Sequence, residues 1–312
     1  MSHATAYYGL ESEQAIFETA ARALAEGNSI RATGRILQID KDTVCDWLGR
    51  AALHCRSVAL YFWTGLHVTE CQLDGLWGFV HTKEAHRPFA EICCEACGDA
   101  WVWLAFAPAW RLVLAFVVGK RTQQNADLLL VRVKDVTDKH IPFFTSDQLA
   151  GYDGELLHAY GVWVRPERKG GRGRFPLPRL VPADGLLYAQ VVKARENGRL
   201  VERDNLTQRQ SNRRLTRRTN GFSKEIIWFE KQPWLSMAYC HFVLPHLSLR
   251  QSLETPEPTR GTRGTLKQWK PVTPAMAAGI TDLCGQQASC SPSGCPLHSW
   301  INRQRSSHCS HC

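Results

Sequence analysis

The sequence predicts a mixed α/β protein with a helical region near its amino terminus. Apolar residues recur at helical spacing over residues 12–53, and strand-like and helix-like segments alternate from residue 68 to residue 193. A hydrophobic fraction of 44% with 21% charged residues is typical of a folded chain. Its 312 residues are enough for two domains, one of which has a sizeable core.

Three short helices are expected in the helical region. Residues 12–26 form the first, with Ser12 placed to cap its start and Gly27 to end it. Residues 29–37 form the second helix, and a third is expected from Lys41 to about Leu53.

A tight turn separates the last two of these helices. Residues 38–40 form the turn, and Asp40 can cap the helix that follows. This order is typical of a helix-turn-helix, although a plain helical hairpin would give the same pattern. In a helix-turn-helix the last helix reaches the base edges of DNA. The polar side of that helix carries Lys41, Thr43, Asp46 and Arg50.

From residue 68 the pattern changes to that of a mixed sheet. The segments expected to be strands are 68–81, 140–147 and 186–193, and those expected to be helices are 123–136 and 153–160. Residues 101–119 approach the length of a membrane span, but Arg111 lies at their centre and Pro108 divides them. We therefore expect two buried strands joined by a short turn, in a soluble cytoplasmic protein without a membrane partner.

The charge of +9 is unevenly distributed. Residues 1–150 carry a net charge of −3 and residues 151–312 one of +12. Within the second half, residues 193–224 hold 10 Lys and Arg against 3 acidic residues. This imbalance indicates a polyanionic partner, of which nucleic acid is the commonest.

Three carboxylates stand out from this background. Asp74 lies in the first expected strand, Asp147 ends another, and Glu202 opens a basic helical stretch. Carboxylates gathered in a cleft repel one another unless a divalent cation such as Mg²⁺ binds them. Helical spacing from Glu202 would place Asn205, Arg209 and Arg213 on one face. With 29 acidic residues in the chain, the trio alone is weak evidence, since any one of them can be a solvated or capping residue.

Several motifs resemble transposases of the insertion-sequence-one family over most of residues 20–283. GNSIRATGRILQIDKDTVCDWL resembles the helix-turn-helix of the family, QLDGLWGFVHTK its first catalytic strand and FFTSDQLAGY its second acidic motif. VERDNLTQRQSNRRLTRRTNGFSK is similar to the third acidic motif and is the most specific match.

The resemblance implies a ribonuclease H-like catalytic core with an acidic (DDE-type) triad of Asp74, Asp147 and Glu202. It implies two Mg²⁺ ions, or Mn²⁺, as cofactors of phosphodiester hydrolysis and strand transfer. The partners implied are double-stranded DNA, as the terminal inverted repeats of the element and as target, and further copies of the chain. The resemblance also implies that the protein is cytoplasmic and associated with the nucleoid of a bacterium or archaeon. The residues expected to contact DNA are Lys41, Thr43, Arg50, Arg203, Asn205, Arg209, Arg213, Arg214, Arg217 and Arg218.

On this basis residues 1–56 are expected to bind DNA, 66–218 to form the catalytic core and 219–283 a C-terminal extension. Residues 284–312 are expected to be a Cys-rich, disordered tail. The link from residue 194 to residue 201 is short for the family, and the tail matches no part of it. Two alternatives therefore stay open: an inactive DNA-binding protein from a decayed element copy, and a regulator that binds zinc through the tail cysteines.

Overall fold

The structure is a computed structural model. It describes residues 5–87, 97–147, 152–167, 176–190, 209, 212–216, 221–258 and 266–282. The chain divides into two compact units. One comprises residues 1–62 and 204–312 with the short segment Trp110–Leu112, and the other comprises residues 63–109 and 113–203.

The first unit begins with the three helices that the sequence predicts: α1 (Gln14–Ala25), α2 (Ile30–Leu37) and α3 (Lys41–Phe62). The expected cap at Ser12 is wrong, because Glu13 occupies the cap position and makes no side-chain capping bond. The third helix is also longer than expected. It continues past Leu53 to Phe62 because apolar residues such as Val58 keep one side of it buried.

Local signals fix the turn between α2 and α3. Ser29 accepts a hydrogen bond from the Ala32 amide at the start of α2, and Asp40 accepts one from the Asp42 amide at the start of α3. Gln38 adopts a left-handed conformation, with φ of 56°. A Cβ atom at Gly34 would lie 2.8 Å from the carbonyl oxygen of Ile39, so only glycine lets α2 pack this closely on the turn.

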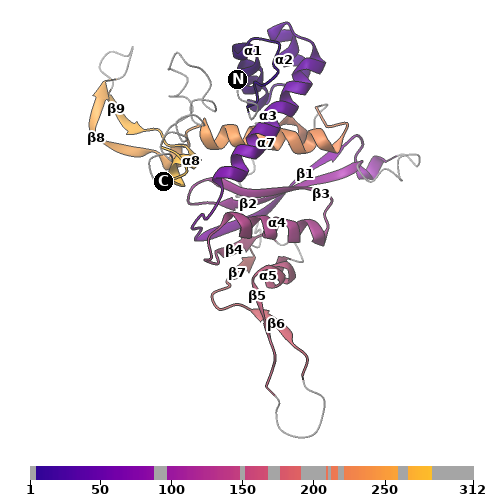
Figure 1. The fold of residues 1–312 in the computed structure, drawn as a ribbon, viewed down its shortest axis with the longest axis vertical. Helices are drawn as coiled ribbons and strands as arrows, with labels where there is room; N and C mark the ends of the chain where they lie inside the picture. Colours follow the sequence, from indigo (N-terminus) through magenta and orange to yellow (C-terminus); the bar gives the residue numbers. More distant parts are fainter. Residues whose placement is uncertain are drawn as a thin grey trace, which may run out of the picture. The chain divides into compact units, whose positions relative to one another are not determined.

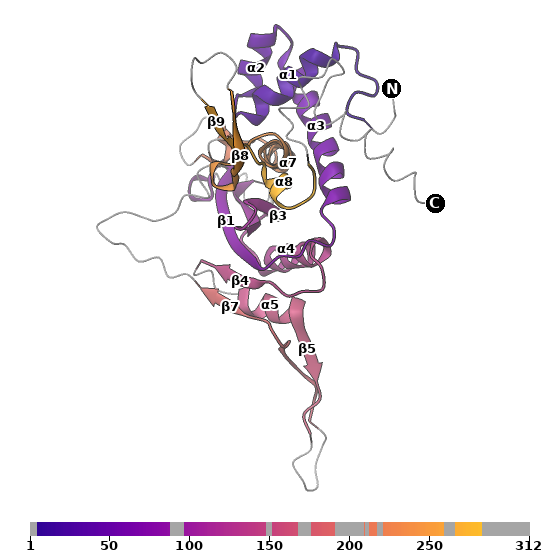
Figure 2. The same cartoon turned by 90° about the vertical axis from the view of Figure 1, so that its left-hand side faces the viewer.

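Helix α7 (Ile226–Phe242) joins these three helices within the first unit, although it lies some 200 residues further along the chain. Figures 1 and 2 show it beside α3. The Gln232 side chain donates to the carbonyl oxygen of Leu24, and the Tyr239 hydroxyl donates to Glu26. Both bonds connect α7 to the end of α1. The rest of this unit holds η3 (Arg213–Leu215), η4 (Leu247–Leu249), the hairpin of β8 (Gln251–Pro258) with β9 (Leu266–Lys270), and α8 (Pro274–Ala277).

A five-stranded sheet organises the second unit. Its strands are β1 (Glu70–Val80), β2 (Gly98–Ala107), β3 (Leu112–Gly119), β4 (Phe143–Ser146) and β7 (Tyr188–Gln190), in the order β3-β2-β1-β4-β7. β1 is antiparallel to β2 and parallel to β4, which is parallel to β7. The two strands expected within residues 101–119 are confirmed, with Arg111 in the turn between them at φ of 55°.

Helices α4 (Gln123–Val136) and α5 (Tyr152–Tyr160) pack on each other, and α4 contacts β2. Both helices are confirmed as predicted. The buried side of α4 carries Leu129, Leu130 and Val133 against the sheet. The unit is therefore a mixed α/β fold with a mixed sheet, compatible with a ribonuclease H-like core.

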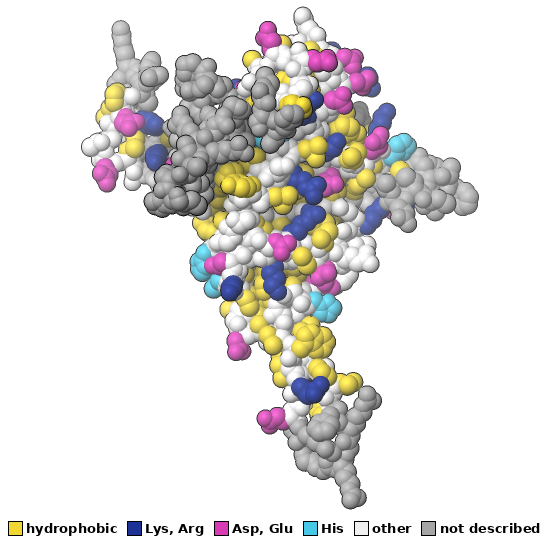
Figure 3. Space-filling model, in the orientation of Figure 1, with side chains coloured by type: hydrophobic (Ala, Val, Ile, Leu, Met, Phe, Trp, Pro, Cys, Tyr) yellow, Lys and Arg dark blue, Asp and Glu magenta, His cyan; other side chains and the backbone are white. Residues whose placement is uncertain are grey.

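A second, two-stranded sheet in this unit pairs β5 (Gly161–Val164) with β6 (Arg179–Pro182). It extends beyond α5 in Figure 1, and apolar side chains gather on its surface in Figure 3. Trp163 is the largest of these, with 68% of its surface exposed. In the part of the chain described, no helix combines the length and apolar character needed to cross a membrane.

Burial gives α7 a pH-sensitive residue. His241 is 3% exposed, and burial lowers its pKa to about 3. The unfolded chain then takes up a proton between pH 6.5 and 3 that the folded chain does not, so stability is lost as the pH falls below 6.5. We expect this residue to remove about 2 kcal/mol from the free energy of unfolding between pH 7 and pH 5.

Urea denaturation at the two pH values measures this loss. In the variant His241→Gln the difference between pH 7 and pH 5 should shrink by about that amount, whereas His158→Gln, at an exposed position, should leave it unchanged. An unaltered pH dependence in His241→Gln would show that burial does not hold His241 neutral.

Candidate functional site

Asp74 and Asp147 are brought together by the pairing of β1 with β4. The parallel register matches Leu73 with Ser146; Asp74 is the next residue of β1, and Asp147 directly follows the end of β4. Neighbouring strands lie about 4.8 Å apart, so the two residues follow each other across the sheet at one level. Both side chains are half-buried.

Hydrogen bonds fix the backbone around both carboxylates. Asp74 Oδ1 accepts from the amide of Gly75 at 2.6 Å. On β4, the Ser146 hydroxyl donates to the carbonyl oxygen of Asp147 at 2.8 Å and lies 2.7 Å from the Tyr188 hydroxyl. Gln190 donates to that same tyrosine at 3.0 Å. These hydrogen bonds connect β7 to Ser146, the last residue of β4.

Tyr152, the first residue of α5, lies close to both aspartates. Its side chain is 1% exposed and meets Trp103 edge to face at 6.0 Å. Burial raises the pKa of the Tyr152 phenol, and the charges of Asp147 and Asp74 raise it further. The charges of both aspartates therefore act on the Tyr152 hydroxyl. Among the described residues, that hydroxyl has no hydrogen-bond partner.

The third expected carboxylate, Glu202, lies outside the described residues, as do Arg203, Asn205, Arg217 and Arg218. In the described part of the chain, no group of three His, Cys, Asp or Glu side chains is placed to hold a metal ion. Asp74 and Asp147 supply oxygen ligands of the kind Mg²⁺ prefers, and one more carboxylate would complete such a set.

The expected DNA-contacting residues of α3 have different surroundings. Lys41 is exposed and pairs with Asp42 at 2.8 Å, and this contact raises the pKa of the lysine. Thr43 is half-buried. Arg50 donates to the carbonyl oxygens of Ala6 and Tyr8, so it holds the amino-terminal segment against α3.

The basic stretch after Glu202 does not continue as one helix through Arg213. Asn212 is extended, with φ of −131° and ψ of 98°, and its side chain caps the short η3 turn. The expected single helical face with Arg209 and Arg213 is therefore wrong, because the cap at Asn212 interrupts any helix between them. Arg209 donates instead to the carbonyl oxygen of Leu215, and Arg214 donates to the Ser223 hydroxyl, both at 2.7 Å.

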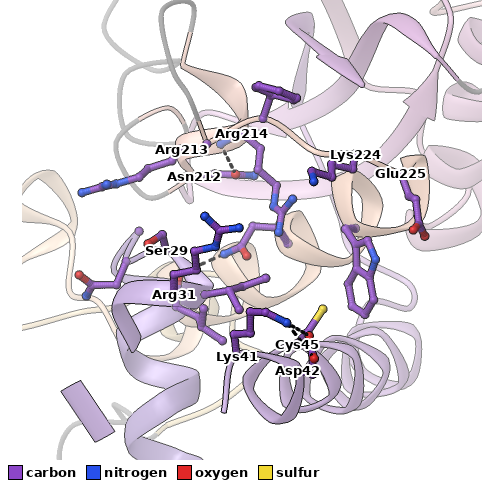
Figure 4. Close-up of a pocket in the computed structure, with 18 residues that line it drawn as sticks. Ser29, Arg31, Lys41, Asp42, Cys45, Asn212, Arg213, Arg214, Lys224 and Glu225 are labelled. Carbon is purple, nitrogen blue, oxygen red and sulfur yellow. Dashed lines mark hydrogen bonds and ion pairs between the residues drawn. The ribbon is translucent and has the colours of Figure 1, made fainter. Parts of the chain in front are cut away.

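A pocket of about 870 Å³ lies within the first unit. Its wall is formed by the starts of α2 and α3, the segment 212–214, and residues 221–232. Figure 4 shows Arg31 and Arg214 reaching toward the same space, while Arg213 extends to one side. The basic residues that line it are Arg31, Lys41, Arg213, Arg214 and Lys224. Arg31 and Lys224 were not among the residues expected to contact DNA, although each lies within one of the motifs quoted above.

The chain is similar to insertion element iso-IS1n protein InsB of Shigella dysenteriae. The two are 27% identical over 161 residues, which span 52% of this chain and 88% of that protein. No family model matches the chain. The similarity supports the resemblance to insertion-sequence-one transposases.

The surroundings of Tyr152 lead to a stability prediction. Because its buried hydroxyl lacks a partner, Tyr152→Phe should raise the free energy of unfolding by about 1 kcal/mol. The matched variant Tyr188→Phe loses the bonds to Ser146 and Gln190 and should lower that free energy by about 1 kcal/mol. Urea denaturation of both variants measures the two changes. A loss of stability in Tyr152→Phe would mean that its hydroxyl is bonded after all.

Proposed function

We propose that this chain is a DNA transposase that binds the ends of an insertion sequence and catalyses phosphodiester hydrolysis and strand transfer. The observation that carries the proposal is the register of β1 and β4, which sets Asp74 beside Asp147 at one level of the sheet. The similarity to a protein of an insertion element supports the same substrate class.

In this proposal Asp74, Asp147 and Glu202 form a DDE-type triad in a ribonuclease H-like core. Together they would hold two Mg²⁺ ions, or Mn²⁺, which supply activation of the attacking oxygen and charge stabilisation at the leaving oxygen. The half-buried setting of both aspartates limits water around the reacting phosphate, and the bonds from Ser146 and Tyr188 keep Asp147 in place.

Two steps follow one another at this site. Water first hydrolyses the bond at the end of the element and leaves a 3′ hydroxyl. That hydroxyl then attacks a phosphodiester of target DNA, forming one bond and breaking another without a covalent protein intermediate. Positioning the DNA backbone for both steps falls to Asn205 and to the arginines that follow Glu202.

End recognition is assigned to the helices α2 and α3 as a helix-turn-helix. The three-residue turn and the capped start of α3 leave Lys41 and Thr43 at the helix end that reaches base edges in this motif. We further propose that the protein works as a homo-oligomer on DNA, since two element ends must be joined, and in the nucleoid of a bacterial or archaeal cell.

The triad makes a direct prediction for catalysis. Asp74→Asn, Asp147→Asn and Glu202→Gln should each abolish strand cleavage in Mg²⁺, because each removes a charged metal ligand. Binding of the same end should change little. The measurement is cleavage of a labelled duplex that carries one element end, with binding followed by gel shift.

Asp153→Asn is the matched control, since Asp153 is an exposed carboxylate on α5 in the same unit. It should cleave as the wild type does. Near wild-type cleavage by any triad variant would remove that residue from the triad. End binding without cleavage by the wild type in Mg²⁺ and Mn²⁺ would favour the inactive DNA-binding protein instead.

A further inference from the structure

The pocket in the first unit gathers cations from three parts of the chain. Arg31 lies in the first turn of α2 and Lys41 begins α3, whereas Arg213, Arg214 and Lys224 come from the segment before α7. Two carboxylates also line it, Asp42 and Glu225. Five basic side chains against two acidic ones leave the pocket positively charged.

The acidic residues neutralise only part of this charge. Both oxygens of Asp42 accept hydrogen bonds from Lys41 at 2.8 Å, so this pair adds no net charge, and four basic side chains remain against Glu225. Within the described part of the chain, Arg31, Arg213 and Lys224 make no ion pair, and all three are exposed. Their charges are therefore open to an anion from solution.

Arg214 is held in the wall of the pocket by hydrogen bonds to buried residues. Its Nη1 donates to the hydroxyl of Ser223, which is 0% exposed. Its backbone amide donates to Asn212, which is 2% exposed. Burial lowers the pKa of Arg214, so a nearby anion would offset the cost of keeping this guanidinium charged.

The starts of both helices add to the positive field. The free amides and the dipole at a helix start favour negative charge, and α2 and α3 both begin at this pocket. A volume of about 870 Å³ is larger than one phosphate needs and fits a stretch of sugar-phosphate backbone.

We propose that this pocket binds the phosphodiester backbone of the DNA that α3 reads, with Arg31, Arg214 and Lys224 as contacts beyond α3. This inference rests on the proposed function, which supplies DNA as the partner. Contacts to phosphate position a protein on DNA without reading its sequence. The segment before α7 would thus fix the orientation of α3 on the duplex, since α7 is bonded to the end of α1 through Gln232 and Tyr239.

The first test uses Arg31→Ala, Lys224→Ala and the double variant in the full chain. Binding is measured by fluorescence anisotropy with a labelled duplex that carries the element end and with a scrambled duplex, over a series of salt concentrations. Lys270→Ala is the matched control, because Lys270 is exposed on β9 in the same unit and does not line the pocket.

Each pocket variant should weaken binding to both duplexes by about the same factor, roughly fivefold or more at low salt. The slope of log affinity against log salt should become shallower by about 0.9 for each lost contact. Lys270→Ala should bind as the wild type does. An unchanged slope in the double variant would contradict the proposal that the pocket binds DNA. A loss of affinity confined to the element-end duplex would contradict it as well.

The second test uses the unaltered protein. Cys45 lines the pocket, whereas Cys240 lies on α7 outside it, and both thiols are half-buried. Alkylation by a maleimide, followed by peptide mass spectrometry, should slow about fivefold or more at Cys45 when the element-end duplex is added, as expected for a backbone seated over the thiol. The rate at Cys240 should stay the same.

The two tests separate the pocket from the proposed function. Duplex binding and cleavage by the wild type, with equal rates at Cys45 with and without DNA, would overturn the pocket and leave the proposed function standing. Absence of duplex binding by the wild type would overturn both.

Discussion

β1 and β4 pair in parallel along Glu70–Leu73 and Phe143–Ser146, and this pairing determines what the second unit can do. Asp74 and Asp147 are 73 positions apart in the sequence, as their numbers show, and only this register brings them to one level. A slip of one residue would turn either carboxylate to the opposite face. The register is held by buried side chains on both strands, such as Leu73 and Phe144, and by the bonds that connect Ser146 to β7. Substitutions in this packing could therefore shift the register and separate Asp74 from Asp147 without replacing either aspartate.

The first unit depends on a different long-range interaction. Helices α1, α2 and α3 form a local arrangement that their caps and turn explain, but α7 adds the packing surface that completes it. Phe229 of α7 is 1% exposed, and Gln232 is buried where it meets the end of α1. Because α7 is seated on these helices, the segment before it lies beside the starts of α2 and α3. The basic pocket is a consequence of that packing, and in the proposed function DNA recognition would involve two segments far apart in the sequence.

The sequence predicted local features well because local signals encode them. The cap at Asp40, the short turn within residues 101–119 and the helix at residues 123–136 follow from spacing and residue type alone. It placed Asp74 and Asp147 on strands but could not supply their register, which is set by packing across the sheet. It failed at Asn212, where a side-chain cap competes with helix formation. It did not identify the role of Arg50, whose partners at Ala6 and Tyr8 are more than 40 residues away. The sequence did not predict the pocket for the same reason, since only the tertiary fold brings Arg31 and Lys224 to one pocket.

The central claim is that Asp74 and Asp147 belong to one cation site. Cleavage of the polypeptide by bound Fe²⁺ with ascorbate and peroxide tests it directly, because the radicals formed cut the backbone only beside the ion. The account predicts cuts next to both Asp74 and Asp147 in the same preparation, suppressed by excess Mg²⁺ and absent from Asp74→Asn. Cuts next to one aspartate alone, or at neither, would contradict it.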